Sequence, residues 1–396
     1  MNTANRKLMM LSANFSEIPL ILAAKEQGFY VVTTGNNPKQ PAHKFADAYV
    51  PHDYSDYEGM VALAKDLGIT AISQGCSDNC ALTAAYMGEK LGLKGHDTFE
   101  NAKIIHRKTD FKKFTASQGI KSPLARYFCS LAQALAFDTE GLYPLIVKPT
   151  DQAGGKGVSK VLNRKEYEKA LKFAFDRTRA GEVVVEAFIE GTLHSLSTFL
   201  VDQKVVAWST FNDYSYANQF MTNSGICPAD NWELAIDVLI QETQKVAQKL
   251  QLVDGLLHMQ YIMQENEPWI IEMMRRTPGN NCTTASSRAT GINWRDWIIR
   301  AEAGMDCHGI PPTRMTEKYY GYHAIMSDCN GVFDSLEIAP SFENKVLDIV
   351  MYESSGAEIT NYLYEKMGVV QFCLDSEEQK DHYMRQINQV LSCKMR

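Results

Sequence analysis

The first hundred residues alternate short apolar runs with helical patterns, and this alternation constrains the fold more than any other feature of the chain. Residues 7–11, 29–32 and 69–73 have the length and apolar content of buried strands. Residues 19–27 and 57–67 lie between these runs and have a helical pattern. Strands that alternate with helices form parallel sheets with right-handed crossovers, so we expect a doubly wound α/β domain here.

We expect this N-terminal domain to be Rossmann-like but without a dinucleotide-binding turn. Its first strand runs into Ser12-Ala13-Asn14-Phe15, where dinucleotide-binding folds carry G-x-G-x-x-G. The sequence therefore disfavours dinucleotide binding.

The 396 residues are enough for two or three domains, because a domain usually holds about 100–200 residues. A basic helical segment begins near residue 101, and residues 232–250 carry the longest amphipathic stripe. After Pro311-Pro312 the pattern changes to short strands separated by turn signals. We predict a domain at 1–97, a second at 98–310 with a lid subdomain at about 123–190, and a small α+β unit at 311–396.

Composition excludes several classes of partner. The net charge of −7 argues against nucleic acid, whose binding depends on a basic surplus. Nine cysteines without a C-x-x-C pair support neither a disulfide framework nor a zinc knuckle. No apolar run approaches the length of a membrane span or a signal core, so we expect a cytoplasmic location and no membrane partner.

A glycine-rich loop is the first candidate for chemistry. The predicted strand 143–149 ends at Lys148 and Pro149, and Asp151-Gln152-Ala153-Gly154-Gly155-Lys156-Gly157-Val158 follows at once. Glycines let backbone N–H groups turn toward a phosphate, and lysines add the compensating charge. A second strand at 158–161 follows in place of a helix, so the loop is not a Walker motif but a flexible hairpin lid. A plain hairpin turn is the alternative.

Two further features stand at fixed offsets from this loop. Lys108 lies 40 residues before Lys148, and an apolar strand at 183–187 runs into the acidic corner 188–191. The end of such a strand offers backbone carbonyl and N–H groups to an adenine edge. The alternative interpretation of this segment is a strand that merely leads into a turn.

The segments 257–263 and 269–274 form a predicted hairpin around the polar turn 264–268. If it is centred on Asn266, Gln260 lies opposite Glu272 and His258 opposite Met274. The period of two then gives one polar face and one apolar face. The polar face holds His258, Gln260, Ile262, Ile270, Glu272, Met274 and Arg276. The apolar face holds Met259, Tyr261, Met263, Trp269, Ile271 and Met273.

Glu272 is the candidate magnesium ligand on the polar face, because a hard cation that bridges phosphates needs oxygen ligands. A solvated or paired surface glutamate is the alternative. Arg276 is a candidate clamp for an anionic intermediate, or a simple salt-bridge partner.

Taken together, these motifs resemble those of the ATP-grasp superfamily, in the three-part arrangement of biotin carboxylase, purine-pathway ligases and L-amino acid ligases. The resemblance covers nearly the whole chain. Its specific parts are Ile146-Val147-Lys148-Pro149 with the Gly154-Gly155-Lys156-Gly157 lid, then Val185-Glu186-Ala187-Phe188-Ile189-Glu190-Gly191, and Glu272-Met273-Met274-Arg275-Arg276.

The resemblance implies ATP and Mg²⁺ (or Mn²⁺) as cofactors and assigns roles to residues. Lys108 and Lys148 would hold ATP phosphates, and His194 would lie on the ribose side. Arg276 and Lys156 would be catalytic, and Glu272 and Gln260 would bind the metal. The lid and the adenine-reading strand would complete the nucleotide site with Gly154, Gly155, Lys156, Gly157, Glu186, Ala187, Phe188 and Ile189.

The chain departs from the family pattern at two metal positions. The family usually has an acidic residue where Gln260 stands and an asparagine where Met274 stands. A thioether is a poor magnesium ligand because it is soft and the ion is hard. Nucleotide binding is therefore better supported by the resemblance than catalysis is.

The leading functional prediction is an ADP-forming carboxylate-amine ligase that makes an amide or peptide bond between small molecules, with amino acids as candidate substrates. The alternative is a nucleotide-binding subunit or sensor of the same fold without turnover. An ATP-dependent carboxylase is disfavoured, because Thr277-Pro278-Gly279 follows Arg276 where biotin carboxylases have a Gln-Val-Glu-His run. Residues 211–228 form a candidate substrate loop or a polar surface loop. The family also implies a homodimer formed through the N-terminal domain.

Overall fold

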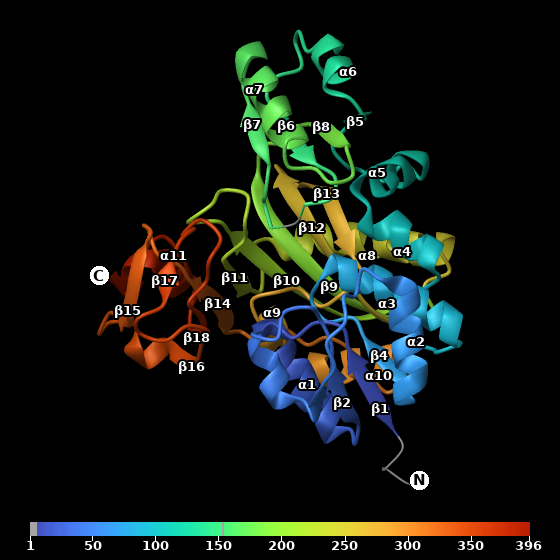
Figure 1. Ribbon diagram of the computed structural model, residues 1–396. Helices are drawn as coiled ribbons and strands as arrows, with labels where there is room; N and C mark the ends of the chain where they lie inside the picture. The colour runs from blue at the N-terminus through green and yellow to red at the C-terminus, as the bar shows by residue number, and fades with distance from the viewer. Residues whose placement is uncertain (1–5, 153) are drawn as a thin grey trace.

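The computed structural model describes residues 6–152 and 154–396 and shows an α/β protein built on four sheets. A parallel sheet near the N-terminus, a large antiparallel sheet and a projecting lid sheet surround one central region (Figure 1). Within the described residues, no helix combines the length and apolar character needed to cross a membrane.

The N-terminal sheet has the order β3-β2-β1-β4, and every pairing in it is parallel, which confirms the parallel pairing predicted from the alternation. Alternate residues of the first strand face opposite layers. Leu8 and Met10 pack with one group of helices, and Met9 and Leu11 pack with another. The strands are β1 (Lys7–Met10), β2 (Tyr30–Thr33), β3 (Ala48–Tyr49) and β4 (Ala71–Ser73).

Helices cover both faces of this sheet. On one side lie α1 (Ile18–Glu26) and α10 (Trp294–Glu302); on the other lie α2 (Tyr57–Leu67) and α3 (Asp78–Leu91). Asp56 caps α2 by accepting the Gly59 N–H at 3.0 Å, and Gly68 ends this helix at φ +65°, which a Cβ would disfavour. Short 3₁₀ turns lie at Phe15–Glu17 and Pro41–Phe45.

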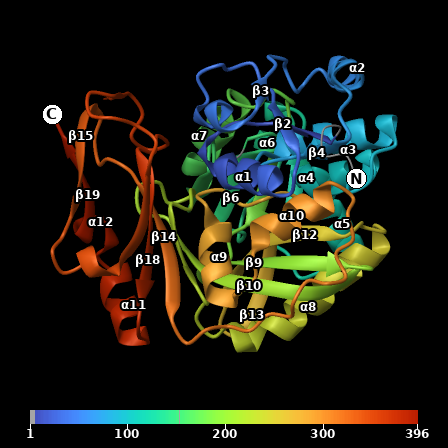
Figure 2. The same ribbon diagram turned by 90° about the horizontal axis from the view of Figure 1, so that it is seen from below.

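The central sheet has eight strands in the order β13-β12-β9-β10-β11-β14-β18-β16. Helix α8 (Trp232–Lys249) packs on one face of it, with Leu239 and Val246 against Leu257 and Met259. Helices α9 (Cys282–Thr290) and α10 lie on the other face (Figure 2). The strands from the middle of the chain are β9 (Thr192–Val201), β10 (Lys204–Tyr214), β11 (Ser224–Cys227), β12 (Gly255–Gln264) and β13 (Glu267–Met274).

The lid is a small antiparallel sheet, β5-β8-β6-β7, that projects from the central sheet (Figure 1). Its antiparallel β6–β7 pairing confirms the predicted hairpin around the glycine-rich loop, of which Ala153 lies outside the described residues. Helices α4 (Phe99–His106) and α5 (Lys108–Ser117) lead into it. The lid elements are β5 (Ala125–Phe128), α6 (Leu131–Ala136), β6 (Leu145–Pro149), β7 (Ser159–Val161), α7 (Arg164–Phe175) and β8 (Val183–Ala187).

The C-terminal segment continues the central sheet, because β14 pairs with β11 through partners such as His323 and Ser224. A separate three-stranded sheet, β17-β15-β19, packs beside it. The boundary near residue 311 therefore stays a prediction. The elements here are β14 (Tyr319–Ile325), β15 (Gly331–Ile338), a 3₁₀ turn (Glu343–Lys345), β16 (Val346–Met351), β17 (Glu358–Ile359), β18 (Gly368–Leu374), α11 (Glu377–Met384), α12 (Ile387–Val390) and β19 (Leu391–Met395).

The hairpin of β12 and β13 confirms part of the predicted register and corrects the rest. Gln260 pairs with Glu272 and His258 with Met274, as predicted. The turn is tighter than predicted, however, and the register shifts at Ile271, so that Tyr261 pairs with Ile270. The extra residue of a β-bulge reverses the alternation beyond it.

This bulge corrects three residues of the predicted faces. Ile270, predicted on the polar face, is buried in the core under α8. Ile271 and Trp269, predicted in that core, are half-buried, and Trp269 pairs with Ile262 on the opposite face.

Arg275 ties the segment between α3 and α4 to the central sheet through a buried ion pair. Its Nε donates to the Asp97 carboxylate at 2.7 Å, and its other nitrogens donate to the carbonyls of Leu256 at 2.7 Å and Val253 at 2.9 Å. The arginine is 6% exposed and Asp97 is 7% exposed, so neither charge has water to replace its partner.

We predict that Asp97→Ala lowers the free energy of unfolding by about 3–5 kcal/mol, because it leaves the Arg275 charge buried and unpaired. Urea denaturation followed by circular dichroism measures this loss. The double variant Asp97→Ala/Arg275→Met should recover part of the stability, and equal destabilisation of the single and double variants would contradict the assignment.

Candidate active site

A cavity of about 340 Å³ lies between the lid sheet and the β12–β13 hairpin. One part of its wall is apolar and the other is charged, which suits a ligand with a flat base and an anionic tail. The apolar part is lined by Pro123, Ile146, Val158, Phe188, Ile189, Leu193, Ile262 and Ile271. The polar part is lined by Asp78, Lys108, Lys148, Gln260, Glu272 and Arg276.

The Glu186 carboxylate holds two lysines beside this cavity. Lys148 Nζ donates to Glu186 Oε2 at 2.9 Å, and Lys112 Nζ lies 3.6 Å from Oε1. Burial alone would raise the pKa of Glu186, but the ammonium groups of Lys112 and Lys148 outweigh burial and hold this pKa below its usual value. The carboxylate therefore faces lysines, and Ala187, Phe188 and Ile189 line the cavity. The roles predicted for these four residues in binding adenine stay predictions.

Sequence reasoning left Lys112 without a role. It is 4% exposed, and burial lowers the pKa of its ammonium group to about 8. The signal was present, because Lys108 and Lys112 are four residues apart and therefore lie on one face of α5.

Lys108 joins the α5 helix to the glycine-rich loop. It is the first residue of the helix, and its Nζ donates to the Gln152 carbonyl at 2.7 Å. Burial lowers the pKa of Lys108, an effect that the nearby Glu272 carboxylate opposes and Lys148 reinforces. Lys108 and Lys148 thus bring two positive charges to one end of the cavity.

The lid glycines differ in their surroundings. Gly154 and Gly155 line the cavity, and both have positive φ values, +65° and +72°. A Cβ on Gly155 would lie 2.4 Å from the Phe220 carbonyl oxygen, whereas a Cβ on Gly154 would meet nothing within 4 Å. Gly157 packs against the Pro149 ring instead of lining the cavity. The close approach of the lid to Phe220 therefore requires glycine at 155.

Lys156 lies outside this cavity. Its Nζ is 5.8 Å from the centroid of the Tyr364 ring, and it lines an adjoining cleft of about 920 Å³ between the lid and α3. Its predicted catalytic role stays a prediction.

His194 does not face the cavity. It stacks on Tyr261 with ring centroids 5.4 Å apart, and its Nε2 lies 2.6 Å from Thr192 Oγ1. Burial lowers the pKa of this imidazole to about 4. Leu193 lines the cavity instead, because successive residues of β9 point to opposite faces. His194 is therefore not among the residues that line this cavity, and its predicted position on the ribose side stays a prediction.

Arg276 lies at the charged end and pairs with the first residue of α3. Its Nε donates to Asp78 Oδ1 at 2.7 Å and its Nη2 to Oδ2 at 3.3 Å, while His106 Nδ1 lies 3.1 Å from Oδ1. The Asp78 carboxylate raises the pKa of Arg276 in spite of its burial. Through this ion pair, helix α3 reaches the cavity. No sequence signal had linked Asp78 to Arg276.

Glu272 and Gln260 are the oxygen donors that fit a magnesium ion. They are register partners on neighbouring strands and both line the cavity. Within the described residues, the Glu272 carboxylate makes no hydrogen bond or ion pair, although Lys108 and Arg276 act on it electrostatically. Met274 is 6% exposed and offers no hard ligand. Two protein oxygens suffice where water and phosphate oxygens complete the shell.

Asp213 is a buried carboxylate beside this pair, placed by sequence reasoning only in the candidate loop 211–228. Residues 211–214 of that segment belong to β10 and residues 224–227 form β11, so the loop between the two strands spans 215–223. Gln260 Nε2 donates to Asp213 Oδ2 at 3.1 Å, and Ser195 Oγ donates to Oδ1 at 3.3 Å. Burial raises the pKa of Asp213 to about 7, and these hydrogen bonds offset only part of the effect.

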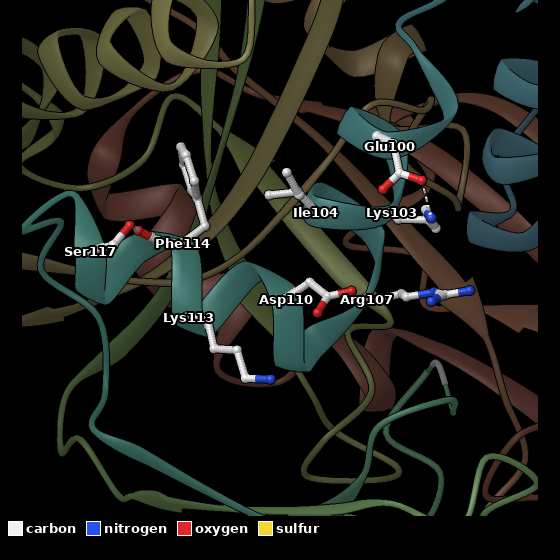
Figure 3. A pocket seen from close by; sticks show the side chains of 8 residues that line it. All are labelled: Glu100, Lys103, Ile104, Arg107, Asp110, Lys113, Phe114 and Ser117. Atoms are coloured by element: carbon white, nitrogen blue, oxygen red, sulfur yellow. Dashed lines mark hydrogen bonds and ion pairs between the residues drawn. The ribbon is translucent and has the colours of Figure 1, made fainter.

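A groove on the outer surface of α4 and α5 is a poorer candidate (Figure 3). Its charged side chains come from two exposed helix faces, and Lys103 pairs with Glu100 in the same groove. A charged helix surface of this kind is solvated and needs no ligand.

Residues 106–280 match the family model described as an ATP-grasp domain. The chain is 22% identical over 285 residues to the carbamoyl phosphate synthase large chain of Caldanaerobacter subterraneus, covering 70% of this chain and 26% of that one. It is 26% identical over 239 residues to the phosphoribosylamine–glycine ligase of Listeria monocytogenes, covering 56% and 57%. The chain thus spans between a quarter and somewhat over half of these relatives.

The fold is similar to that of a solved L-amino acid ligase from Bacillus licheniformis. The TM-score is 0.81 at 19% identity, and the match covers 99% of each chain. This likeness extends the shared fold over the N-terminal and C-terminal segments as well.

We predict that Gly155→Ala weakens ADP binding at least about tenfold, because a methyl group there keeps the lid from Phe220 and a left-handed alanine costs a further 1–2 kcal/mol, roughly. Isothermal titration calorimetry measures the affinity. Gly154→Ala is the matched control: it has a similar φ but no contact, so it should weaken binding much less. Equal losses in the two variants would contradict a role for the Phe220 contact.

Proposed function

We propose that this protein is an ATP-dependent, ADP-forming ligase that joins a carboxylate to an amine, because residues 106–280 match the family model described as an ATP-grasp domain. Such a ligase activates the acid as an acyl phosphate, and the amine then displaces phosphate. The likeness to ligases of amino acids and of phosphoribosylamine supports this class of reaction.

One observation carries the proposal: a single cavity combines an apolar part, two lysines and the Glu272 carboxylate, which makes no hydrogen bond or ion pair with the residues that the structure describes. In the proposed complex, adenine lies between Ile146 and Ile262, and the phosphates lie toward Lys108 and Lys148. Glu272 and Gln260 would hold Mg²⁺, which neutralises phosphate charge when bound.

Two further parts of the cavity have roles in this proposal: the lid loop excludes water, and Arg276 binds the reacting group. The lid loop covers the phosphates, and its seat against Phe220 closes the side of the cavity. Arg276, fixed by Asp78, presents a guanidinium where negative charge develops on the acyl group. Catalysis in this scheme consists of positioning and charge stabilisation.

The substrates proposed are small molecules, with an amino acid as acid or amine. The loop 215–223 lies against the cavity through Gln219, Phe220 and Thr222, which supports a role in substrate selection. We keep the proposed organisation of a Rossmann-like domain at 1–97, an ATP-grasp domain at 98–310 and a closing unit at 311–396. A homodimer remains part of this proposal as a family expectation.

A second candidate function is nucleotide sensing without turnover. The observation that favours it is the pair of neutral side chains, Gln260 and Met274, next to Glu272.

We predict that the purified protein releases phosphate from ATP and Mg²⁺ only when both an acid and an amine are present. Pools of amino acids with a coupled phosphate assay test this, and mass spectrometry identifies the ligated product. ATP binding without turnover in any pool would favour the sensor over the ligase.

Under the ligase proposal, Glu272→Ala should reduce turnover by at least about a thousandfold, because it removes the charged metal ligand. Glu267→Ala is the matched control, since this glutamate lies on the same strand but at the exposed hairpin tip, paired with Lys121. Full activity in Glu272→Ala would refute the metal assignment.

A further inference from the structure

Lys366 of the C-terminal segment is linked to the wall of the cavity through one side-chain amide. It lies between β17 and β18, and its Nζ donates to Asn280 Oδ1 in the loop that follows β13. An ammonium group only donates hydrogen bonds, so the Asn280 oxygen must face it. The Asn280 NH₂ group donates to the Thr222 carbonyl at 3.1 Å, and Thr222 lines the cavity.

The lid reaches the same segment. Lys156 Nζ lies 5.8 Å from the centroid of the Tyr364 ring, and Tyr364 is two residues before Lys366. Gly155, next to Lys156, closely approaches the backbone of Phe220 in the loop between β10 and β11. The segment that carries Lys366 therefore borders both the lid and the loops at the cavity.

The Lys366 ammonium group has no counter-charge in the part of the chain that the structure describes. Its side chain is partly buried, and burial lowers its pKa to about 8, with no carboxylate to oppose the effect. Its one acceptor is the neutral oxygen of Asn280. By contrast, the more deeply buried Lys112, Lys148 and Lys380 all pair with carboxylates. Because neutral pH lies below 8, Lys366 keeps a positive charge that these residues do not neutralise.

The place of Lys366 indicates which anion would compensate this charge. In the proposed complex the ATP phosphates meet Lys108 and Lys148, and Lys366 is not among the described residues that line their cavity. The loop from Arg276 to Asn280 leads instead from the proposed acyl group to Lys366. The anion is therefore expected on the substrate, beyond the group that reacts. The anion that a small acid or amino acid offers there is a second carboxylate.

We propose that Lys366 binds a substrate carboxylate that takes no part in the reaction. This inference rests on the proposed ligase function and names a substrate class for it. An amino acid that reacts through its amine carries such a carboxylate, and so does a dicarboxylic acid that reacts at one end. Both offer the same chemistry, because an ammonium group has three N–H donors and Asn280 accepts only one of them.

The test measures binding of carboxylate probes to the full chain, with ADP and Mg²⁺ present, by isothermal titration calorimetry. The first arm pairs each of the common amino acids with its carboxamide. The second arm pairs succinate and glutarate with their monoamides. No ATP is present, so a failure of ligase turnover leaves the measurement intact.

In at least one arm, the carboxylate should bind about 10–100-fold more tightly than its amide, because its hydrogen bonds to an ammonium group are charge-assisted. Lys366→Gln should reduce this ratio to about threefold or less, since its amide can still donate to Asn280 but carries no charge. Lys318→Gln is the matched control: this exposed lysine of the same C-terminal segment pairs with Asp375 at 2.9 Å, and its replacement should keep the full ratio.

Thermal unfolding checks that each variant folds, and Lys366→Met, which also removes the charge, is a second variant for the same comparison. A preference for carboxylate in the first arm assigns the bound group to the amine substrate. A preference in the second arm assigns it to the acid substrate.

Two results would overturn the proposal. One is that no probe in either arm binds the unchanged protein more tightly than its amide does. The other is a preference for carboxylate that is equal in Lys366→Gln and in the unchanged protein, which would place the bound carboxylate elsewhere. If the preference depends on Lys366 but no pool of acid and amine gives turnover, the ligase proposal fails and the carboxylate site stands.

Discussion

The organisation of the site depends on the buried ion pairs that the Glu186 carboxylate makes with Lys112 and Lys148. The carboxylate holds Lys148 of the lid strand β6 and Lys112 of helix α5, two elements that belong to different layers. A glutamate that is 3% exposed can stay charged only because two ammonium groups compensate it. The same contacts fix Lys148 in the wall of the cavity, so the charge that stabilises the base of the lid also faces the cavity.

The central sheet separates an apolar environment from a polar one. Its α8 side is apolar and holds Tyr261, Met259 and His194, while its other side carries Gln260, Glu272 and Asp213. Because alternate residues of a strand face opposite layers, each strand contributes to both. The bulge at Ile271 alters this alternation within β13 and turns one more apolar side chain into the cavity.

Much of the fold and part of the site could be predicted from sequence, because their signals are local. The parallel N-terminal pairing follows from the rhythm of strands and helices, and the Gln260–Glu272 pair follows from the length of the hairpin. The side of the sheet on which His194 lies could not be predicted, because a resemblance gives a position along the chain but not the face of the strand. Ile270 and Ile271 were exchanged because a bulge has no clear mark in the sequence.

The sequence by itself determined which chemical groups the site has: lysines at fixed spacing, glycines at the lid and a carboxylate opposite an amide. Only the tertiary structure decided which of these groups meet. Asp78 reaches Arg276 across almost two hundred residues, and Asp213 reaches Gln260 from a strand two places away in the sheet. Such contacts depend on how layers stack and strands align, and burial then sets the charge of each group; neither is encoded in local pattern.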